Sequence, residues 1–381
     1  MNDVFLTHAA VCLPNEPVSN DEMEAVLGMP TGSPSRARRA ILRSNGITQR
    51  YYVIDKRSGK VTHTNAQLTA AAVRNLGAAG VPLGQMDLLV CGTTLPDQLM
   101  PNHALMVHGE LGLPALEAVA TSGICLAGMS ALKYAWLAVR SGESRLAVTT
   151  GSDVASLAMR AQQYLPETEH QARDLEQRPE LAFEKDFLRW MLSDGAGAWA
   201  MQARPRPEGR SLRIEWVELF SYANELPVCM YAGATKGADG RLTGWMAHTP
   251  DECRDQSVFA IKQDVRLLNQ FIAPMTVGKP LAALKSRRGL GAGTVDWLLP
   301  HVSSCYFIEP LARALATSGL PIPRERWFTN LVEKGNTGAA SPYIMLEEFF
   351  NSDRMQPGAR ILLFVPESGR FSAAFAYLTV V

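Results

Sequence analysis

Residues 121–132 read TSGICLAGMSAL, and this stretch places a cysteine where a turn of small residues runs into an amphipathic segment. From Leu126 the apolar positions 126, 129, 132, 136 and 139 recur every three to four residues, and Ser141-Gly142 interrupts the pattern. This periodicity predicts a helix that begins at or near Cys125. Three roles are then open for Cys125: a packing residue, a redox thiol or a nucleophile at a helix N-terminus.

The position of Cys125 supports a role as nucleophile only if other catalytic residues exist elsewhere in the chain. The unpaired N–H groups of a first helical turn and the helix dipole favour thiolate over thiol, so we expect a lowered pKa for Cys125. Small neighbours such as Gly123 and Gly128 would let a substrate carbonyl approach the sulfur. A cysteine at a helix start is nevertheless more often a packing residue than a reactive one.

An internal repeat supplies candidate partners. Asp87-Leu-Leu-Val-Cys-Gly-Thr-Thr and Asp296-Trp-Leu-Leu-Pro-His-Val-Ser are both short apolar strands that open with Asp. Cys125 follows Asp87 at nearly the spacing at which Asn336 follows Asp296, and each stands where a small-residue turn enters a predicted helix. Continuous apolar strands of the type buried on both faces of a sheet then start at Arg145 and Arg360.

The repeat predicts an α/β protein of two similar halves, 1–204 and 205–381. The boundary falls in Ala203-Arg-Pro-Arg-Pro-Glu-Gly-Arg210, the most loop-like composition of the chain. Residues of about 155–192 predict a mostly helical insertion in the first half, either a solvated cover or a wall of a substrate pocket.

His301 and Asn336 complete a candidate centre. His301 follows a buried-type strand that ends at Pro300, and catalytic groups of open α/β sheets collect at such carboxyl ends. If the halves are related by an approximate twofold, both helix starts converge with the histidine between them. The alternatives are a half-buried structural histidine and a turn asparagine that tolerates a left-handed conformation.

Composition restricts the class of protein. The 381 residues are 47% hydrophobic and carry 37 basic and 37 acidic side chains, which argues against nucleic-acid or membrane-surface binding. No apolar run reaches the length of a membrane span, and the N-terminus has no secretory pattern. Six scattered cysteines without a C-x-x-C pair favour neither a metal site nor a disulfide framework, so we expect no metal and a cytoplasmic location.

Several ordered motifs together resemble one known family over essentially the whole chain. They are CGTTLPDQLMPNHALMVHGELGLPALEAVATSGICLAGMSAL, SDGAGA, DWLLPHVSS, EKGNTGAAS and PESGRFSAAFAYL, and they are similar to the β-ketoacyl-acyl-carrier-protein synthase III group of the thiolase superfamily. The resemblance implies a five-layered αβαβα fold of two duplicated βαβαβαββ halves and a homodimer.

The same resemblance implies a Cys-His-Asn active centre of Cys125, His301 and Asn336. Backbone N–H groups of Cys125 and Gly369 would form the oxyanion hole. It implies no cofactor besides the phosphopantetheine of acyl carrier protein or coenzyme A that carries the acyl thioesters, and acyl carrier protein as the partner.

Two departures from the family pattern concern substrate binding. The usual His-Gln-Ala-Asn is His301-Val-Ser-Ser304, and the basic residue common five places after the histidine is Tyr306, which favours a carrier-bound substrate over free coenzyme A. Arg39 and Arg43, in the cluster Arg36, Arg38, Arg39 and Arg43, are candidates to receive a phosphopantetheine arm or an acidic carrier protein, or else form a solvated helix face. Glu309 is a candidate base for α-proton removal, or a surface glutamate.

A closer resemblance is to the condensing enzymes of dialkylresorcinol and cyclohexanedione assembly. It rests on LPNEPVSNDEME, PSRARRAILRSNGITQRYY and HTNAQLTAAA. It implies the joining and cyclisation of two acyl thioesters, one a β-ketoacyl unit. An ordinary synthase III of fatty-acid initiation, a non-condensing acyltransferase and a silent acyl-binding subunit are the alternatives.

Other motifs are set aside. Ser193-Asp-Gly-Ala-Gly-Ala198 lacks the phosphate-loop pattern and is predicted to be a tight turn, and His103 and His108 lack a ligand partner at metal spacing. Cys, His and Asn in this order also occur in papain-like proteases, but their characteristic cysteine context is missing.

Overall fold

Nine strands form one continuous sheet that folds around two central helices. The computed structural model describes residues 1–29, 32, 34–35, 38–163 and 188–381. The sheet order is β13-β14-β15-β8-β1-β7-β6-β4-β5, and its two arms join where Phe5 and Leu6 of β1 pair with Arg213 and Leu212 of β8. The sheet strands are β1 (Phe5–Cys12), β4 (Leu88–Thr93), β5 (Glu117–Ser122), β6 (Ala147–Asp153), β7 (Gly195–Gln202), β8 (Leu212–Ser221), β13 (Trp297–Pro300), β14 (Arg360–Glu367) and β15 (Ser372–Val380).

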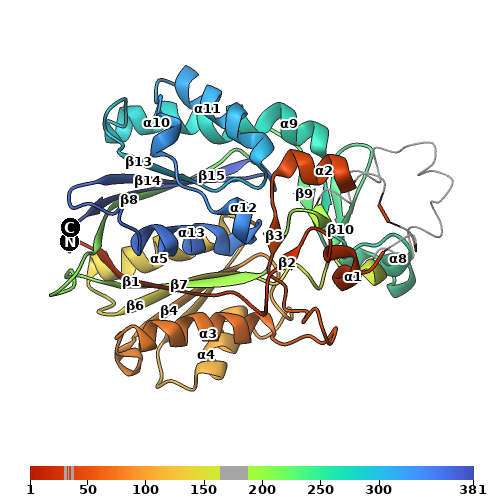
Figure 1. Cartoon of the computed structure of the whole chain (residues 1–381), viewed down its shortest axis with the longest axis horizontal. Coiled ribbons are helices and arrows are strands. Elements are labelled where there is room, and N and C mark those ends of the chain that lie inside the picture. Colours follow the sequence, from red (N-terminus) through yellow and green to blue (C-terminus); the bar gives the residue numbers. More distant parts are fainter. Residues whose placement is uncertain (30–31, 33, 36–37, 164–187) are drawn as a thin grey trace.

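The arms and helices stack in five layers. Helices α5 and α13 lie between the two arms, α3 and α4 cover one arm, and α9, α10 and α11 cover the other (Figure 1). The main helices are α3 (Asn65–Ala78), α4 (His103–Leu111), α5 (Ala127–Ser141), α9 (Val265–Ala273), α10 (Lys279–Arg288), α11 (Ile308–Thr317) and α13 (Ser341–Phe350). This is the thiolase fold that the sequence predicted.

The remaining helices and strands are short and lie at one end of the sheet. They are α1 (Met23–Leu27), α2 (Arg38–Asn45), α8 (Pro250–Asp255), α12 (Leu331–Lys334), and the strands β2 (Val18–Ser19), β3 (Gln49–Arg50), β9 (Met230–Tyr231), β10 (Ala234–Lys236), β11 (Leu242–Gly244) and β12 (Lys262–Gln263). Between α9 and α10 the chain forms a π-helix, η4 (Pro274–Gly278), in which Thr276 Oγ1 donates to the Ile272 carbonyl at 2.5 Å.

Helix α13 packs closely against β7 because glycine there leaves room for its side chains. A Cβ at Gly197 of β7 would collide with Tyr343 Cβ of α13, so this position needs glycine. The Tyr343 ring stacks on Trp199 with centroids 4.0 Å apart, and both residues are fully buried. The prediction of a tight turn at 193–198 was wrong at Gly195–Ala198, which belong to β7: small residues there serve close helix packing.

Both predicted Asp-led strands show the same contact. Asp87 accepts hydrogen bonds from the N–H groups of Arg145 and Leu146, which precede β6, and Asp296 accepts one from the N–H of Arg360, which opens β14. Each Asp therefore pins the start of the neighbouring parallel strand. Two related halves divided near 204 stay our proposal, and most of the predicted insertion, 164–187, lies outside the described residues.

Candidate active site

One cavity is lined by Cys125, His301 and Asn336 together. The empty space in the cavity and at its open mouth together amounts to about 1030 Å³. Most of its wall is apolar, with side chains from the segment 188–192, from α9 and η4, and from α11. The residues that sequence reasoning placed in one centre thus lie around one chamber, although they come from distant parts of the chain.

Cys125 lies in the turn between β5 and α5. The turn is closed by the Ala127 N–H, which donates to the Ile124 carbonyl at 3.1 Å, and α5 begins two residues after the sulfur and ends at Gly142 in a left-handed conformation. Burial, followed by the charges of Glu367 and Asp153, raises the pKa of Cys125 well above its usual range. The prediction of a lowered pKa was wrong, because desolvation and two carboxylates outweigh the helix dipole.

Glu367 is a residue that sequence reasoning missed. Its Oε2 accepts hydrogen bonds from the backbone N–H groups of Ile124 at 3.0 Å and Leu126 at 2.9 Å, the two residues that flank Cys125. Burial raises the pKa of Glu367 and the two N–H donors oppose that rise. The available signal was a carboxylate shortly after the buried run Ile361–Val365 and close to a glycine.

His301 leaves β13 with its backbone fixed and its ring buried. Its N–H donates to the Phe364 carbonyl at 2.7 Å, the residue is 4% exposed, and ring Nε2 has no hydrogen-bond partner among the described residues. Burial lowers the pKa of His301 to about 4. The imidazole is therefore neutral at pH 7 and keeps one ring nitrogen for a ligand.

Asn336 is held by its own turn. Its Oδ1 accepts the Gly338 N–H at 3.0 Å, while its backbone N–H donates to Met191 and its carbonyl accepts from Ser193. Because Oδ1 is engaged, the amide Nδ2 is the group that Asn336 can offer to a substrate oxygen. The turn leads through η7 (Gly338–Ala340) into α13.

Asp153 ties this turn to the sheet. At the end of β6 it accepts hydrogen bonds from the N–H and hydroxyl of Thr94 at 2.8 and 2.7 Å and from the Ala339 N–H at 2.7 Å. Burial raises the pKa of Asp153 to about 6 against those donors. Gly338 has φ +56°, and a Cβ there would collide with the carboxylate, so glycine is needed for this contact.

Gly369 lies beside the nucleophile turn. It is buried, and a Cβ on it would stand 2.7 Å from Ile124 Cδ1. Its carbonyl accepts the N–H groups of Cys229 and Met230. The structure therefore brings Gly369 next to the residue before Cys125.

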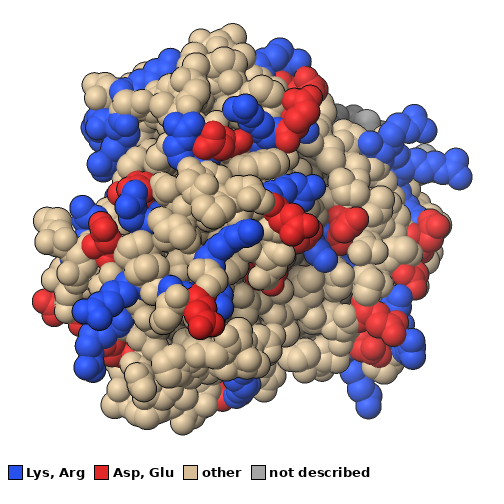
Figure 2. All heavy atoms as spheres, turned by 60° about the vertical axis from the view of Figure 1, so that its left-hand side comes forward, with Lys and Arg blue, Asp and Glu red and all other residues tan. Residues whose placement is uncertain are grey.

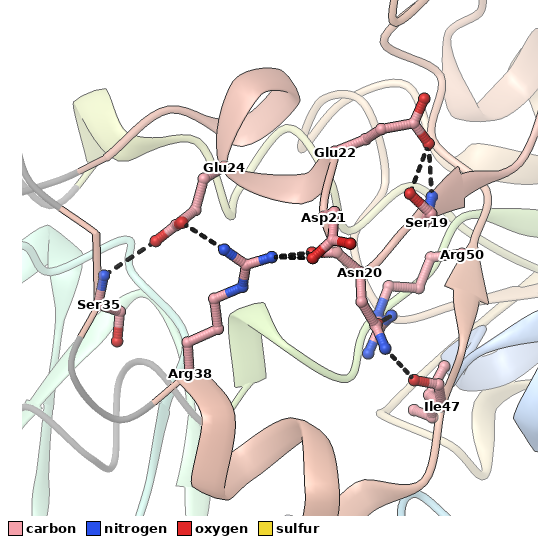
Figure 3. A network of polar contacts seen from close by, with 9 residues as sticks. All are labelled: Ser19, Asn20, Asp21, Glu22, Glu24, Ser35, Arg38, Ile47 and Arg50. Carbon is pink, nitrogen blue, oxygen red and sulfur yellow. Dashed lines mark hydrogen bonds and ion pairs between the residues drawn. The ribbon is translucent and has the colours of Figure 1, made fainter.

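The arginines predicted to bind a carrier lie on α2, and they differ from their neighbour Arg38 in their contacts. Arg39 and Arg43 are exposed on α2, whereas Arg38 is engaged by Asp21 and Glu24, each at 2.9 Å (Figure 3). In the same view Arg50 lies beside Asn20; its guanidinium also donates to the Trp190 carbonyl. Arg36 lies outside the described residues.

Ser304, Tyr306 and Glu309 stand apart from the cavity lining. Ser304 is fully buried and its Oγ accepts the Tyr306 N–H at 3.2 Å, while Tyr306 is 51% exposed and Glu309 is exposed at the start of α11. The neighbouring Ser303 and Phe307 are the residues of this segment that line the chamber.

The outer surface carries charges of both signs. On the face shown in Figure 2, groups of Lys and Arg side chains and groups of Asp and Glu side chains are scattered among larger areas without charged residues. Within residues 1–29, 38–163 and 188–381, no cluster of His, Cys, Asp and Glu could hold a metal ion. Within the same part, no helix is long and apolar enough to cross a membrane.

Comparisons with known proteins give mutually consistent similarities. A family model described as "3-Oxoacyl-[acyl-carrier-protein (ACP)] synthase III C terminal" matches residues 286–377. Similar curated proteins are the "Beta-ketoacyl-[acyl-carrier-protein] synthase III" of Bordetella petrii, 27% identical over 92% of this chain and 90% of the relative, and that of Xanthomonas oryzae pv. oryzae, 26% identical over the same shares.

Solved structures share the fold. "AbyA1 - tetronic acid condensing enzyme" superposes with a TM-score of 0.75 at 22% identity, covering 99% of both chains. A variant of OleA from Xanthomonas campestris superposes with a TM-score of 0.72 at 20% identity, covering 99% of this chain and 98% of the other.

Proposed function

We propose that the chain is an acyl-condensing enzyme of the 3-oxoacyl-[acyl-carrier-protein] synthase III type, which it resembles over about nine tenths of its length, and that it catalyses one specific reaction. It joins two acyl thioesters, one of them a β-ketoacyl unit, by a carbon–carbon bond. The product then closes to a 1,3-cyclohexanedione-type precursor of a dialkylresorcinol. The observation that carries this proposal is the shared chamber of Cys125, His301 and Asn336 with its long apolar wall.

The first half-reaction is acyl transfer to Cys125. The sulfur attacks the thioester carbonyl, its proton leaves with the carrier thiol, and an acyl-cysteine remains. Backbone N–H groups of Cys125 and Gly369 would stabilise the oxyanion, a contribution of about 3–4 kcal/mol per donor in comparable sites. The raised pKa of Cys125 means that the thiol keeps its proton until a substrate is bound.

The second half-reaction forms the carbon–carbon bond. His301 and Asn336 donate hydrogen bonds to the carbonyl oxygen of the second thioester, which stabilises its enolate after loss of an α-proton. The α-carbon attacks the acyl-cysteine and expels the Cys125 thiolate, which takes up a proton. A conjugate addition onto an α,β-unsaturated component would close the ring without any oxidant.

The apolar wall supports an alkyl-bearing substrate. Met191, Leu192, Leu268, Ile272 and Leu311 are among the apolar residues that line the chamber. Apolar surface of this kind binds a hydrocarbon chain through the hydrophobic effect. A two-carbon starter acyl group would leave most of it uncovered.

Carrier protein is the proposed source of the substrates. Arg39 and Arg43 are exposed on α2, which packs against the η5 turn (Cys305–Phe307), and Phe307 of this turn lines the chamber. Exposed guanidinium groups at this place suit the phosphate of a phosphopantetheine arm or an acidic protein surface.

We further propose a homodimer formed through the β5 edge. β5 is the last strand of the sheet and has an unpaired side, and the nearby helix α5 exposes Tyr134 and Leu137. A second copy would cover these groups and extend the sheet. Cys125 follows β5 by three residues, so the dimer contact would lie next to the candidate site.

An ordinary 3-oxoacyl synthase III is the second candidate, since that activity is named for the curated relatives that match over nine tenths of the chain. Two incubations separate the candidates. The enzyme is given a long-chain α,β-unsaturated acyl and a β-ketoacyl carrier-protein thioester in one, and acetyl-coenzyme A with malonyl carrier protein in the other, each with C125A as control. A cyclised product from the first supports the proposal; a 3-oxoacyl product from the second alone overturns it.

A further inference from the structure

A polar pair interrupts the apolar wall of the chamber. Gln263 of β12 is 5% exposed, and its Nε2 donates to the Oγ of Ser368 at 3.0 Å. Both residues line the chamber together with Cys125, His301 and Asn336. The acyl-transfer and condensation steps described above use neither of them.

The pair has hydrogen-bonding capacity to spare. Ser368 Oγ lies 3.6 Å from Met230 Sδ, and a thioether sulfur is a weak acceptor. Gln263 Oε1 has no donor among the described residues. A hydroxyl and an amide oxygen in an apolar chamber gain free energy when a polar ligand atom pairs with them.

Ser368 is also close to the nucleophile turn. It stands between Glu367, whose carboxylate binds the N–H groups on both sides of Cys125, and Gly369, which packs on Ile124. Ser368 and Cys125 line the same chamber, so an acyl thioester that reacts at Cys125 is bound in a space that the Ser368 hydroxyl borders. Most of the other side chains around that space are apolar.

We propose that Ser368, oriented by Gln263, donates a hydrogen bond to the 3-oxo oxygen of the β-ketoacyl substrate and thereby selects this substrate over a saturated acyl thioester. The inference rests on the proposed function and names the group that distinguishes its two substrates. Ser368 is a specificity-determining residue in this scheme, and Gln263 is its positioning residue. With a saturated chain, the Ser368 hydroxyl would have only the weak Met230 thioether as an acceptor, which disfavours that chain relative to the 3-oxo substrate.

Binding of two inert analogues tests the inference without relying on chemistry. The probes are pantetheine amides of one chain length, one 3-oxoacyl and one saturated, in which nitrogen replaces the thioester sulfur so that Cys125 is not acylated. Their Kd values are measured by calorimetry on the full-length wild type, S368A, S368T and Q263M. T276V is the matched control, since Thr276 lines the same chamber but its hydroxyl is engaged by the Ile272 carbonyl.

The wild type should prefer the 3-oxo amide, and S368A should reduce that preference about two- to tenfold. Q263M should reduce it by a smaller factor, whereas S368T, which restores the hydroxyl, and T276V should retain it. An equal loss of affinity for both amides in S368A, or the same change in T276V, overturns the inference. The proposed function fails separately, if the wild type forms no carbon–carbon product from the thioesters themselves.

Discussion

Glu367 Oε2 accepts a hydrogen bond from the backbone N–H of Leu126 at 2.9 Å, so a carboxylate occupies the donors at the beginning of α5. The neighbouring sulfur of Cys125 thus faces a negative charge where a helix N-terminus would otherwise favour its thiolate. This arrangement keeps the thiol protonated in the resting protein.

Replacing Glu367 by glutamine should make Cys125 more reactive. The amide oxygen of the E367Q side chain retains an acceptor for the N–H groups while the negative charge is removed, so the pKa of Cys125 should fall. Alkylation of Cys125 by iodoacetamide at pH 7, followed by peptide mass spectrometry, should accelerate by about tenfold for each unit of pKa. E309Q, at an exposed site, is the control, and an unchanged rate in E367Q would disprove the charge effect.

Two variants separate the half-reactions. C125A should form no acyl adduct in intact-protein mass spectrometry, and H301A should acylate normally but condense poorly. Loss of one enolate donor is expected to lower the condensation rate about 10²–10³-fold. An adduct on C125A eliminates this nucleophile, and normal condensation by H301A removes the proposed role of the imidazole.

Asp153→Asn should impair condensation more than acylation. Only one oxygen would remain to accept from Thr94 and Ala339, and the amide NH2 would face N–H and hydroxyl donors, so the Asn336 turn should loosen. We expect a loss of about 1–3 kcal/mol in the free energy of unfolding. Single-turnover rates of acylation and of condensation are compared between D153N and the wild type. Equal losses in both rates would mean that Asp153 contributes only to the stability of the fold.

The free energy of unfolding should decrease at acidic pH because His301 is buried. The unfolded chain binds a proton near pH 6.5, whereas burial delays protonation of folded His301 to about pH 4. Folding stability is therefore lost as the pH falls from 6.5 toward 4, by up to about 1.4 kcal/mol per pH unit. Urea unfolding at pH 7.5 and 5 should show a smaller loss for H301N than for the wild type. His103, whose pKa burial also lowers to about 4, acts in the same direction in both proteins.

The proposed dimer can be broken at α5. Tyr134→Glu and Leu137→Glu together place two charges on the exposed apolar face beside β5. Light scattering should report a dimer for the wild type and a monomer for the double variant. V332E, at an exposed valine of α12, is the control, and a monomeric wild type would refute the assembly.

Much of the fold follows from local pattern. The runs after Asp87, Arg145, Asp296 and Arg360 form β4, β6, β13 and β14, because continuous apolar sequences bury both faces of a strand. The helix predicted from Leu126 onward is α5. The Gly-Ala alternation of 195–198 gave no such signal, since only the partner helix α13 explains why glycine is needed there.

The candidate residues could be selected from the sequence, whereas the charges around them could not be predicted. Spacing and resemblance selected Cys125, His301 and Asn336, which line one chamber. The charge at the nucleophile comes from Glu367, 242 residues after Cys125, and the polar pair joins Gln263 to Ser368 across 105 positions. Contacts of that range have no local periodicity, so a single sequence does not reveal them.

The π-helix η4 forms a part of the chamber wall whose side chains depend on its helical spacing. Thr276 and Val277 of η4, and Ile272 and Ala273 just before it, face the substrate space where the chain carries about one residue more per turn than an α-helix. Deletion of one residue there would return the segment to α-helical spacing and turn different side chains inward. Such a change would alter the shape of the apolar wall while Cys125, His301 and Asn336 keep their places.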